Sequence, residues 1–220
     1  QVLEMLSQCY TEQGEMELLV KLLPVMLKAD MLDEKRATEL KQHAAVIELQ
    51  HSKDAESLQA DWKGLPKLMQ RDVEVIRTFA DQAIRLGAQQ LTEEVLRAHL
   101  KRDWDSSLLP LYGEPGPDDA SKRMRQCEKW LLTHPEDPWL HLTLGRLCAR
   151  EELWGKAREH LIRSLELEPS VAGYDSLGQL LERKGELEVA LCCFRTALRL
   201  NQGKDPQPLP GELARLEPPA

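Results

Sequence analysis

The sequence predicts an all-α protein built as a stack of antiparallel helix hairpins, and three observations support this fold class. Charged residues make up 30% and aromatic residues only 5% of the 220 positions, a composition that favours surface-rich helices over strands. Leucine and alanine recur at spacings of three and four residues, as they do on one buried face of a helix. Near the C-terminus a unit of about 33 residues occurs twice, and such periods are typical of stacked hairpins.

The repeated unit runs first from Pro138 to Pro169 and then from Val171 to Asn201. Gly145 in the first copy aligns with Gly178 in the second, 33 residues later. Glycine inside a helix costs about 1 kcal/mol relative to alanine, so its recurrence indicates that a neighbouring helix approaches closely there. The residues predicted to make these packing contacts are small and occur in both copies: Gly145, Ala157, Gly178 and Ala190.

Prolines and a glycine predict where these helices begin and end. Pro138 suits a first helical position, and Pro169 ends a second helix. Gly185 suits a turn that needs a left-handed backbone. Because one short hairpin cannot bury both of its apolar faces, the copies are expected to stack on one another.

This pattern resembles the tetratricopeptide repeat. Gly145 and Ala157 stand at its glycine and alanine sites, Leu161 at its aromatic or aliphatic site, and Pro169 at its terminal proline. The second copy departs from the pattern because Gln202 stands where a proline is usual. The resemblance implies a right-handed superhelical stack in which the first helix of each hairpin lines a concave groove.

Weaker hairpins are predicted upstream. They comprise two helices around Gly14, a long helix over Asp33 to Asp54 with Asp33 as its N-cap, and two helices around Gly87. A further helix is predicted over Asp118 to Thr133, capped by Pro117 and Asp118. The predicted organisation is therefore degenerate hairpins over 1–112, a loop over 113–117, tetratricopeptide repeats over 118–202 and a proline-rich tail over 203–220.

Charge, cysteines and hydropathy limit the classes of partner. The net charge of −8 argues against nucleic acid and acidic membrane surfaces as partners. Five cysteines without C-x-x-C spacing favour a reducing compartment. No apolar run reaches the roughly 18 residues that suggest a membrane helix. The sequence begins at Gln1 without a cap or signal peptide, so we expect a segment missing upstream.

The sequence carries none of the common enzyme motifs. It lacks a G-x-G-x-x-G after a strand, a Walker loop, H-E-x-x-H and G-x-S-x-G. No histidine stands three or four residues from another histidine or a cysteine, as a metal site on one helix would need. We therefore predict a binding protein with no catalytic residues and no metal site.

The first helices of the two clear repeats supply the candidate partner-binding residues, because the resemblance places these helices along the groove. Arginines in such a groove can receive a carboxylate or an acidic peptide through paired hydrogen bonds. An ordinary solvated surface is the alternative, and the asparagines typical of carboxylate-clamp grooves are lacking. The candidates are Trp139, Leu142, Arg146 and Arg150 in the first repeat, and Asp175, Gln179 and Arg183 in the second.

Five stretches resemble the C-terminal part of the HemY family of proteobacteria. They are Trp62-Lys63-x-Leu65-Pro66, Arg71-Asp72-x-Glu74-Val75, Lys101-Arg102-x-Trp104-Asp105 with Leu108, Leu111, Tyr112 and Gly113, Leu144-Gly145-Arg146-Leu147, and Leu153-Trp154-Gly155-Lys156-Ala157-Arg158. The resemblance implies a protein of late protohaem biosynthesis, anchored in the bacterial inner membrane by N-terminal helices, with this domain on the cytoplasmic side. It does not imply the flavin-dependent oxidase that bears the same name in other bacteria.

Three functions are considered, of which the first two follow from this resemblance and the third holds if the resemblance is superficial. The first is a non-catalytic scaffold that binds late haem-pathway enzymes such as ferrochelatase and needs no cofactor. The second is a haem or porphyrin carrier, for which His99, His141 and Cys148 are the candidate axial ligands. The third is a peptide-binding adaptor unrelated to haem. The tryptophans are expected to fill gaps between hairpins, with a porphyrin stacked on an exposed indole as the alternative.

Overall fold

The computed structural model describes residues 2–13, 15–29, 31, 33–114, 116 and 120–207. Within these ranges the regular structure consists of helices that pack against their neighbours in the sequence, which confirms the predicted all-α class. The right-handed superhelical stack stays a prediction. The chain forms two compact units, residues 1–103 and 104–220. This division lies before the predicted loop 113–117, of which positions 115 and 117 are outside the described residues.

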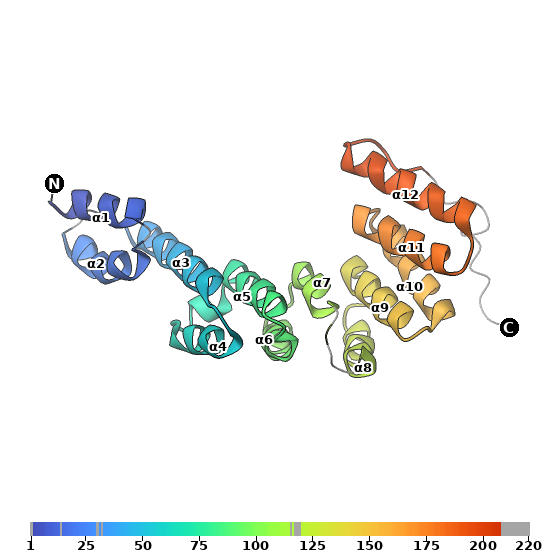
Figure 1. The fold of residues 1–220 in the computed structure, drawn as a ribbon, viewed down its shortest axis with the longest axis horizontal. Helices are drawn as coiled ribbons and strands as arrows, with labels where there is room; N and C mark the ends of the chain where they lie inside the picture. The colour runs from blue at the N-terminus through green and yellow to red at the C-terminus, as the bar shows by residue number, and fades with distance from the viewer. Residues whose placement is uncertain are drawn as a thin grey trace. The chain divides into compact units, whose positions relative to one another are not determined.

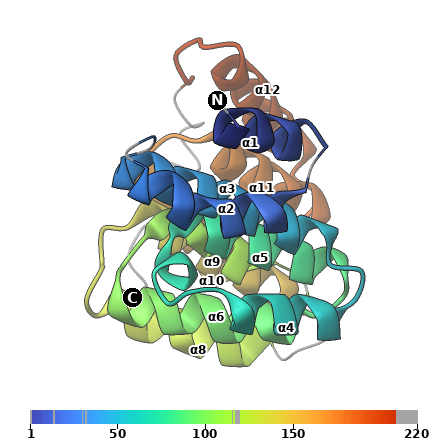
Figure 2. The same cartoon turned by 90° about the vertical axis from the view of Figure 1, so that its left-hand side faces the viewer.

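Unit 1, residues 1–103, contains six α-helices and one short 3₁₀-helix among its described residues. In Figures 1 and 2, α2 lies beside both α1 and α3. The helix α5 contacts α3, α4 and α6. The elements are α1 (Val2–Gln13), α2 (Met16–Lys28), α3 (Glu34–His51), α4 (Ala55–Gly64), η1 (Met69–Arg71), α5 (Val73–Arg85) and α6 (Gln89–Arg102). The turn predicted at Gly14 lies outside the described residues.

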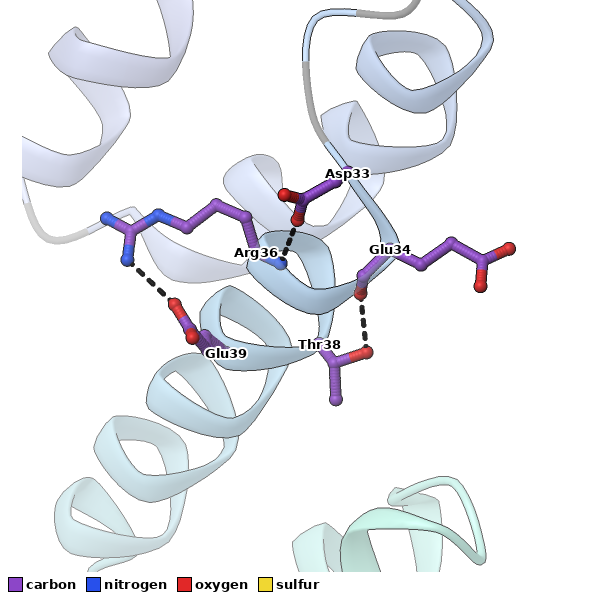
Figure 3. A network of polar contacts seen from close by, with 5 residues as sticks. All are labelled: Asp33, Glu34, Arg36, Thr38 and Glu39. Carbon is purple, nitrogen blue, oxygen red and sulfur yellow. Dashed lines mark hydrogen bonds and ion pairs between the residues drawn. The ribbon is translucent and has the colours of Figure 1, made fainter.

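The predicted long helix begins as expected but is shorter than predicted. The Asp33 carboxylate accepts a hydrogen bond of 2.6 Å from the backbone nitrogen of Arg36, at the start of α3 (Figure 3). The prediction that this helix continues to Asp54 is wrong, because Ser52 takes an extended conformation. Asp54 instead caps α4, where it and Ser57 form a reciprocal capping box. Sequence reasoning missed α4 because it merged this second cap with the end of the preceding helix.

Unit 2, residues 104–220, holds the two clear repeats as two consecutive hairpins. Figure 1 shows α9, α10, α11 and α12 following one another, and successive members are in contact. The elements are η2 (Ser106–Leu108), α7 (Leu109–Tyr112), α8 (Ala120–Leu131), α9 (Pro138–Arg150), α10 (Trp154–Leu167), α11 (Val171–Arg183) and α12 (Leu187–Asn201). The cap predicted at Pro117 and Asp118 lies outside the described residues, as does 208–220 of the predicted tail.

Two of the predicted helix signals are confirmed in this unit. Pro138 occupies the first turn of α9, behind the cap that Asp137 provides to the backbone nitrogen of Leu140 at 3.0 Å. Gly185, between α11 and α12, has a φ of 80°, a conformation that favours glycine. Arg158 on α10 also reaches Glu186 beside α12, with 3.3 Å between its Nη1 and the carboxylate Oε1. This ion pair joins the two hairpins.

The two repeat glycines make the same contact in their respective hairpins. A Cβ atom added at Gly145 on α9 would lie 2.6 Å from the Cγ of Leu161 on α10. A Cβ atom added at Gly178 on α11 would lie 2.6 Å from the Cε1 of Phe194 on α12. Leu161 and Phe194 are equivalent positions, 33 residues apart. The absent side chain therefore allows the second helix of each hairpin to pack against the first.

The repeat alanines and the tryptophans fill the space around these contacts. Ala157 and Ala190 are buried in the apolar core of the two hairpins. Trp154 packs against that core as well. Earlier in the unit, Trp104 stacks on His134 with 3.8 Å between ring centroids, and its Nε1 donates to Asp137 Oδ2 at 2.9 Å. Packing within the unit thus accounts for these indoles, for Trp154 against the apolar core and for Trp104 against the segment between α8 and α9.

A histidine pair joins the two helices of the first hairpin. Nδ1 of His141 on α9 lies 3.1 Å from Nδ1 of His160 on α10, and Nε2 of His141 lies 3.0 Å from the carbonyl oxygen of Pro135. Because a carbonyl only accepts, His141 carries its proton on Nε2 and accepts at Nδ1 from His160. Burial, and then the nearby His141, lower the pKa of His160.

Replacing Gly145 by alanine is expected to lower the free energy of unfolding by about 1–3 kcal/mol, because the added methyl overpacks against Leu161. Urea denaturation followed by circular dichroism measures the change. Gly155→Ala is the matched control, because no atom lies within 4 Å of the position a Cβ would take there. Equal stabilities of Gly145→Ala and the wild type would contradict the packing role.

Acidification is expected to destabilise the protein through His160. Its folded-state pKa is lower than the usual 6.5, so the unfolded chain binds the proton more readily. The contribution of the neutral His160 side chain to the free energy of unfolding is fully present above pH 6.5 and is lost as the pH falls below that value. Unfolding midpoints between pH 7.5 and 5.5 measure it. His160→Gln should reduce the change of the unfolding midpoint with pH, whereas His43→Gln, at an exposed position, should not alter it. An unchanged pH dependence in His160→Gln would show that His160 is not the group responsible.

Candidate functional site

A hollow of about 440 Å³ lies between α9 and α11 in unit 2. Both helices are the first members of their hairpins, which is where the tetratricopeptide resemblance predicts a binding groove. The hollow contains three arginines among charged, polar and apolar neighbours. Its lining residues are Gly113, Glu114, Arg146, Ala149, Arg150, Leu161, Asp175, Ser176, Gln179, Leu180 and Arg183.

Helical spacing brings the polar side chains to the hollow. Arg146 and Arg150 are four residues apart on α9, and Asp175, Gln179 and Arg183 follow the same spacing on α11. Residues four apart lie on the same face of a helix. Each helix therefore presents one polar stripe, and the two stripes line the same hollow.

Each arginine on α9 reaches across to another element. Arg146 Nε donates to the Ser176 hydroxyl on α11 at 2.8 Å. Arg150 Nη1 donates to the carbonyl oxygen of Gly113 at 3.2 Å. Throughout the described part of the chain, no carboxylate forms an ion pair with Arg146, Arg150 or Arg183. These three guanidinium groups therefore lack a counter-ion from the described residues.

A fourth arginine supports one wall of the hollow from inside the unit. Arg123 on α8 is only 4% exposed, and its Nη1 donates to the carbonyl oxygens of Tyr112 and Glu114. Arg150 binds the intervening carbonyl of Gly113. Two guanidinium groups thus hold three successive carbonyls, and the last two residues of this stretch, Gly113 and Glu114, form the wall.

Burial and like charge make the environment of Arg150 unfavourable for a cation. Its pKa is lowered, first by burial and then by the charge of Arg123, while Glu114 acts in the opposite direction. The nearest acid on α11, Asp175, already accepts a hydrogen bond of 2.8 Å from the Gln179 amide. Positive charge in the hollow is therefore incompletely balanced.

The structure brings together five of the seven groove candidates and separates two. Arg146, Arg150, Asp175, Gln179 and Arg183 line the hollow. Leu142 does not face it, because this leucine is fully buried in the part of α9 that packs against α7, α8, α10 and α11. Trp139 is half-buried against the apolar core and is not part of the hollow.

Sequence reasoning missed the residues that enter the hollow through tertiary contacts. Ser176 follows Asp175 directly but is buried, and its role depends on the hydrogen bond from Arg146. Gly113 and Glu114 precede the repeats and reach the hollow only because Arg123 and Arg150 bind this stretch. No periodicity in the sequence signals either contact.

Two of the candidate haem ligands are already engaged within unit 2. Both ring nitrogens of His141 have partners, His160 and the carbonyl of Pro135. Cys148 is 1% exposed, its sulfur lies 3.4 Å from the Met124 sulfur, and burial raises the pKa of its thiol to about 11. As arranged, neither side chain presents a ligand atom to an outside group.

The third candidate, His99, lies in unit 1 at a separate hollow of about 330 Å³. The side chain is 5% exposed, and its Nδ1 lies 3.2 Å from Arg102 Nη2. Trp62 also lines this hollow, and its ring packs on Phe79 with 4.6 Å between centroids. Burial and the neighbouring guanidinium thus restrict access to the imidazole.

Neither a metal-binding cluster nor a membrane-spanning helix is found among the described residues. They contain no group of three or more histidine, cysteine or acidic side chains arranged to hold a metal ion. None of their helices combines the length and the apolar character that crossing a membrane requires.

Comparison with known proteins identifies relatives along nearly the whole chain. No protein-family model matches the sequence. It is 25% identical over 212 residues to Protein HemY of Escherichia coli strain K12, an alignment that covers 94% of this chain and 52% of that protein. Protein HemY of Escherichia coli O157:H7 and of Shigella flexneri match equally. The chain thus spans about half the length of the curated relatives it matches, and the resemblance to HemY indicated by the sequence motifs is confirmed.

Proposed function

We propose that this chain is the repeat-bearing part of a HemY-family protein and acts as a non-catalytic tetratricopeptide-type scaffold that binds other proteins. The observation that carries the proposal is the arginine-lined hollow between α9 and α11. It lies between the first helices of two consecutive hairpins, and three of its cations have no ion-pair partner among the described residues. Arginines without a counter-ion in a shared hollow are more typical of a surface that binds a partner than of an ordinary solvated helix face.

We further propose that the partners are enzymes of late protohaem biosynthesis, such as ferrochelatase, at the bacterial inner membrane. The similarity to Protein HemY over 94% of the chain supports this assignment. A scaffold raises the local concentration of the proteins it binds, which suits a pathway whose intermediates pass between enzymes. In the proposed arrangement this domain lies on the cytoplasmic side, and membrane attachment belongs to a part of the whole protein outside this chain.

The scaffold is favoured over a haem carrier because of the candidate ligands. His141 and Cys148 already contact other side chains within unit 2, and His99 is nearly fully buried. Axial ligation through any of the three would require breaking packed contacts. An adaptor unrelated to haem uses the same hollow, so the identity of the captured partner separates it from the proposed function.

The proposal is tested by site-specific photo-crosslinking in living bacteria that carry the whole protein. A photoreactive amino acid at Gln179, which is exposed and lines the hollow, is expected to capture a haem-pathway enzyme identified by mass spectrometry. The same amino acid at Arg195, exposed on α12, is the matched control. Equal capture at both positions, or capture only of proteins unrelated to haem synthesis, would refute the assignment.

A further inference from the structure

We propose that the hollow between α9 and α11 binds an acidic segment of a partner protein, with its carboxylates seated against Arg146, Arg150 and Arg183. This inference rests on the proposed protein-binding function and specifies the chemistry of the partner. It concerns a surface where cations from two successive hairpins line the same hollow.

The hydrogen bond between Arg146 and Ser176 sets the register of the two helices. Arg150 lies one turn beyond Arg146 on α9, and Arg183 lies two turns beyond Asp175 on α11. A helical turn of four residues advances about 6 Å, so the arginines are distributed along the hollow. Alternate residues of an extended segment point to the same face and lie about 6.6 Å apart, so their carboxylates have a comparable spacing and can meet more than one arginine.

Charge complementarity identifies the occupant as an anion. Arg183 makes no hydrogen bond or ion pair with a described residue, and Arg146 and Arg150 each donate only one bond, to a neutral oxygen. The remaining guanidinium N–H groups are therefore available to an acceptor. Behind them, Arg123 contributes a further positive charge that its carbonyl partners do not neutralise. Binding a carboxylate would offset the like-charge and burial effects that lower the pKa of Arg150.

The neighbouring apolar side chains favour a peptide over a bare inorganic anion. Ala149, Leu161 and Leu180 line the same hollow as the arginines, and they offer contacts to the methylene groups of glutamate. A volume of about 440 Å³ lies within the range of pockets that hold a short chain segment. The planar guanidinium group also matches the two oxygens of a carboxylate.

The experiment uses a fluorescein-labelled hexaglutamate peptide and the purified 220-residue chain. Fluorescence anisotropy is expected to give saturable binding that weakens as salt rises from 50 to 300 mM, on the order of tenfold. Arg183→Gln is expected to weaken binding about threefold to tenfold. The Arg150→Gln, Arg183→Gln double variant should weaken it further. Because Arg150 also supports the wall, circular dichroism melting checks that each variant folds, and Arg183→Gln alone keeps the test valid if the double variant does not.

Arg163→Gln is the matched control, because it removes the same charge from α10, where Arg163 pairs only with Glu166 at 3.2 Å. It should bind hexaglutamate as the wild type does. Equal weakening by Arg163→Gln would overturn the inference, as would no effect of Arg183→Gln. Displacement of the peptide by inorganic phosphate at equimolar concentration would identify a general anion site instead and also overturn it.

The result of the hexaglutamate experiment can be told apart from the result of the crosslinking experiment that tests the proposed function. If crosslinking at Gln179 captures a haem-pathway enzyme but hexaglutamate fails to bind, the scaffold function stands and the acidic-segment inference is wrong. If hexaglutamate binds through Arg183 but crosslinking captures no haem-pathway enzyme, the site chemistry stands and the pathway assignment is wrong.

Discussion

The close approach of the two helices within each hairpin is the constraint on which the rest of unit 2 depends. A hydrogen atom at Gly145 and at Gly178 leaves the space that Leu161 and Phe194 occupy. This contact brings α10 against α9 and α12 against α11, so the partly exposed stripes of α9 and α11 are left facing a shared hollow. A single methyl group at either glycine would separate the helices, and with them the arginines that the proposed function uses.

The hollow illustrates how a repeat protein gains a binding surface without an elaborate loop. Most of its lining residues come from two helices whose order is set by the hairpin repeat, and Gly113, Glu114 and Leu161 of α10 come from outside them. Positive charge is concentrated there although the chain as a whole carries a net charge of −8. The net negative charge of the chain disfavours an acidic ligand, whereas the arginines of the hollow favour it, and this contrast supports selectivity more than affinity.

Sequence reasoning succeeded where the contacts repeat and failed where they are singular. The period of 33 residues predicted the hairpins and their packing glycines, and the tetratricopeptide resemblance named five residues that line the hollow. The resemblance also placed Leu142 in the groove, because this leucine shares a helical stripe with Arg146, but the side chain is fully buried and does not line the hollow. Sequence reasoning could not find Arg123, whose partners are backbone carbonyls, or the pairing of His141 with His160 across a hairpin, since neither contact follows a local spacing. The length of α3 was also overestimated, because Asp54, which caps α4, was interpreted as the end of the helix that Asp33 begins.

The stretch Tyr112, Gly113 and Glu114, whose last two residues form the wall, contacts its arginines through main-chain oxygens. Every amino acid carries that oxygen, so the identity of the half-buried third position can change during evolution while the shape of the recess persists. The first position is fixed by its side chain instead, because Tyr112 is buried and its ring packs against Trp130. The middle position has no such freedom, because a Cβ atom there would come within 2.9 Å of the Thr143 methyl group. Divergent homologues are thus expected to retain a large aromatic residue and a glycine ahead of a variable third position, a signature that an identity score over the whole chain would not reveal.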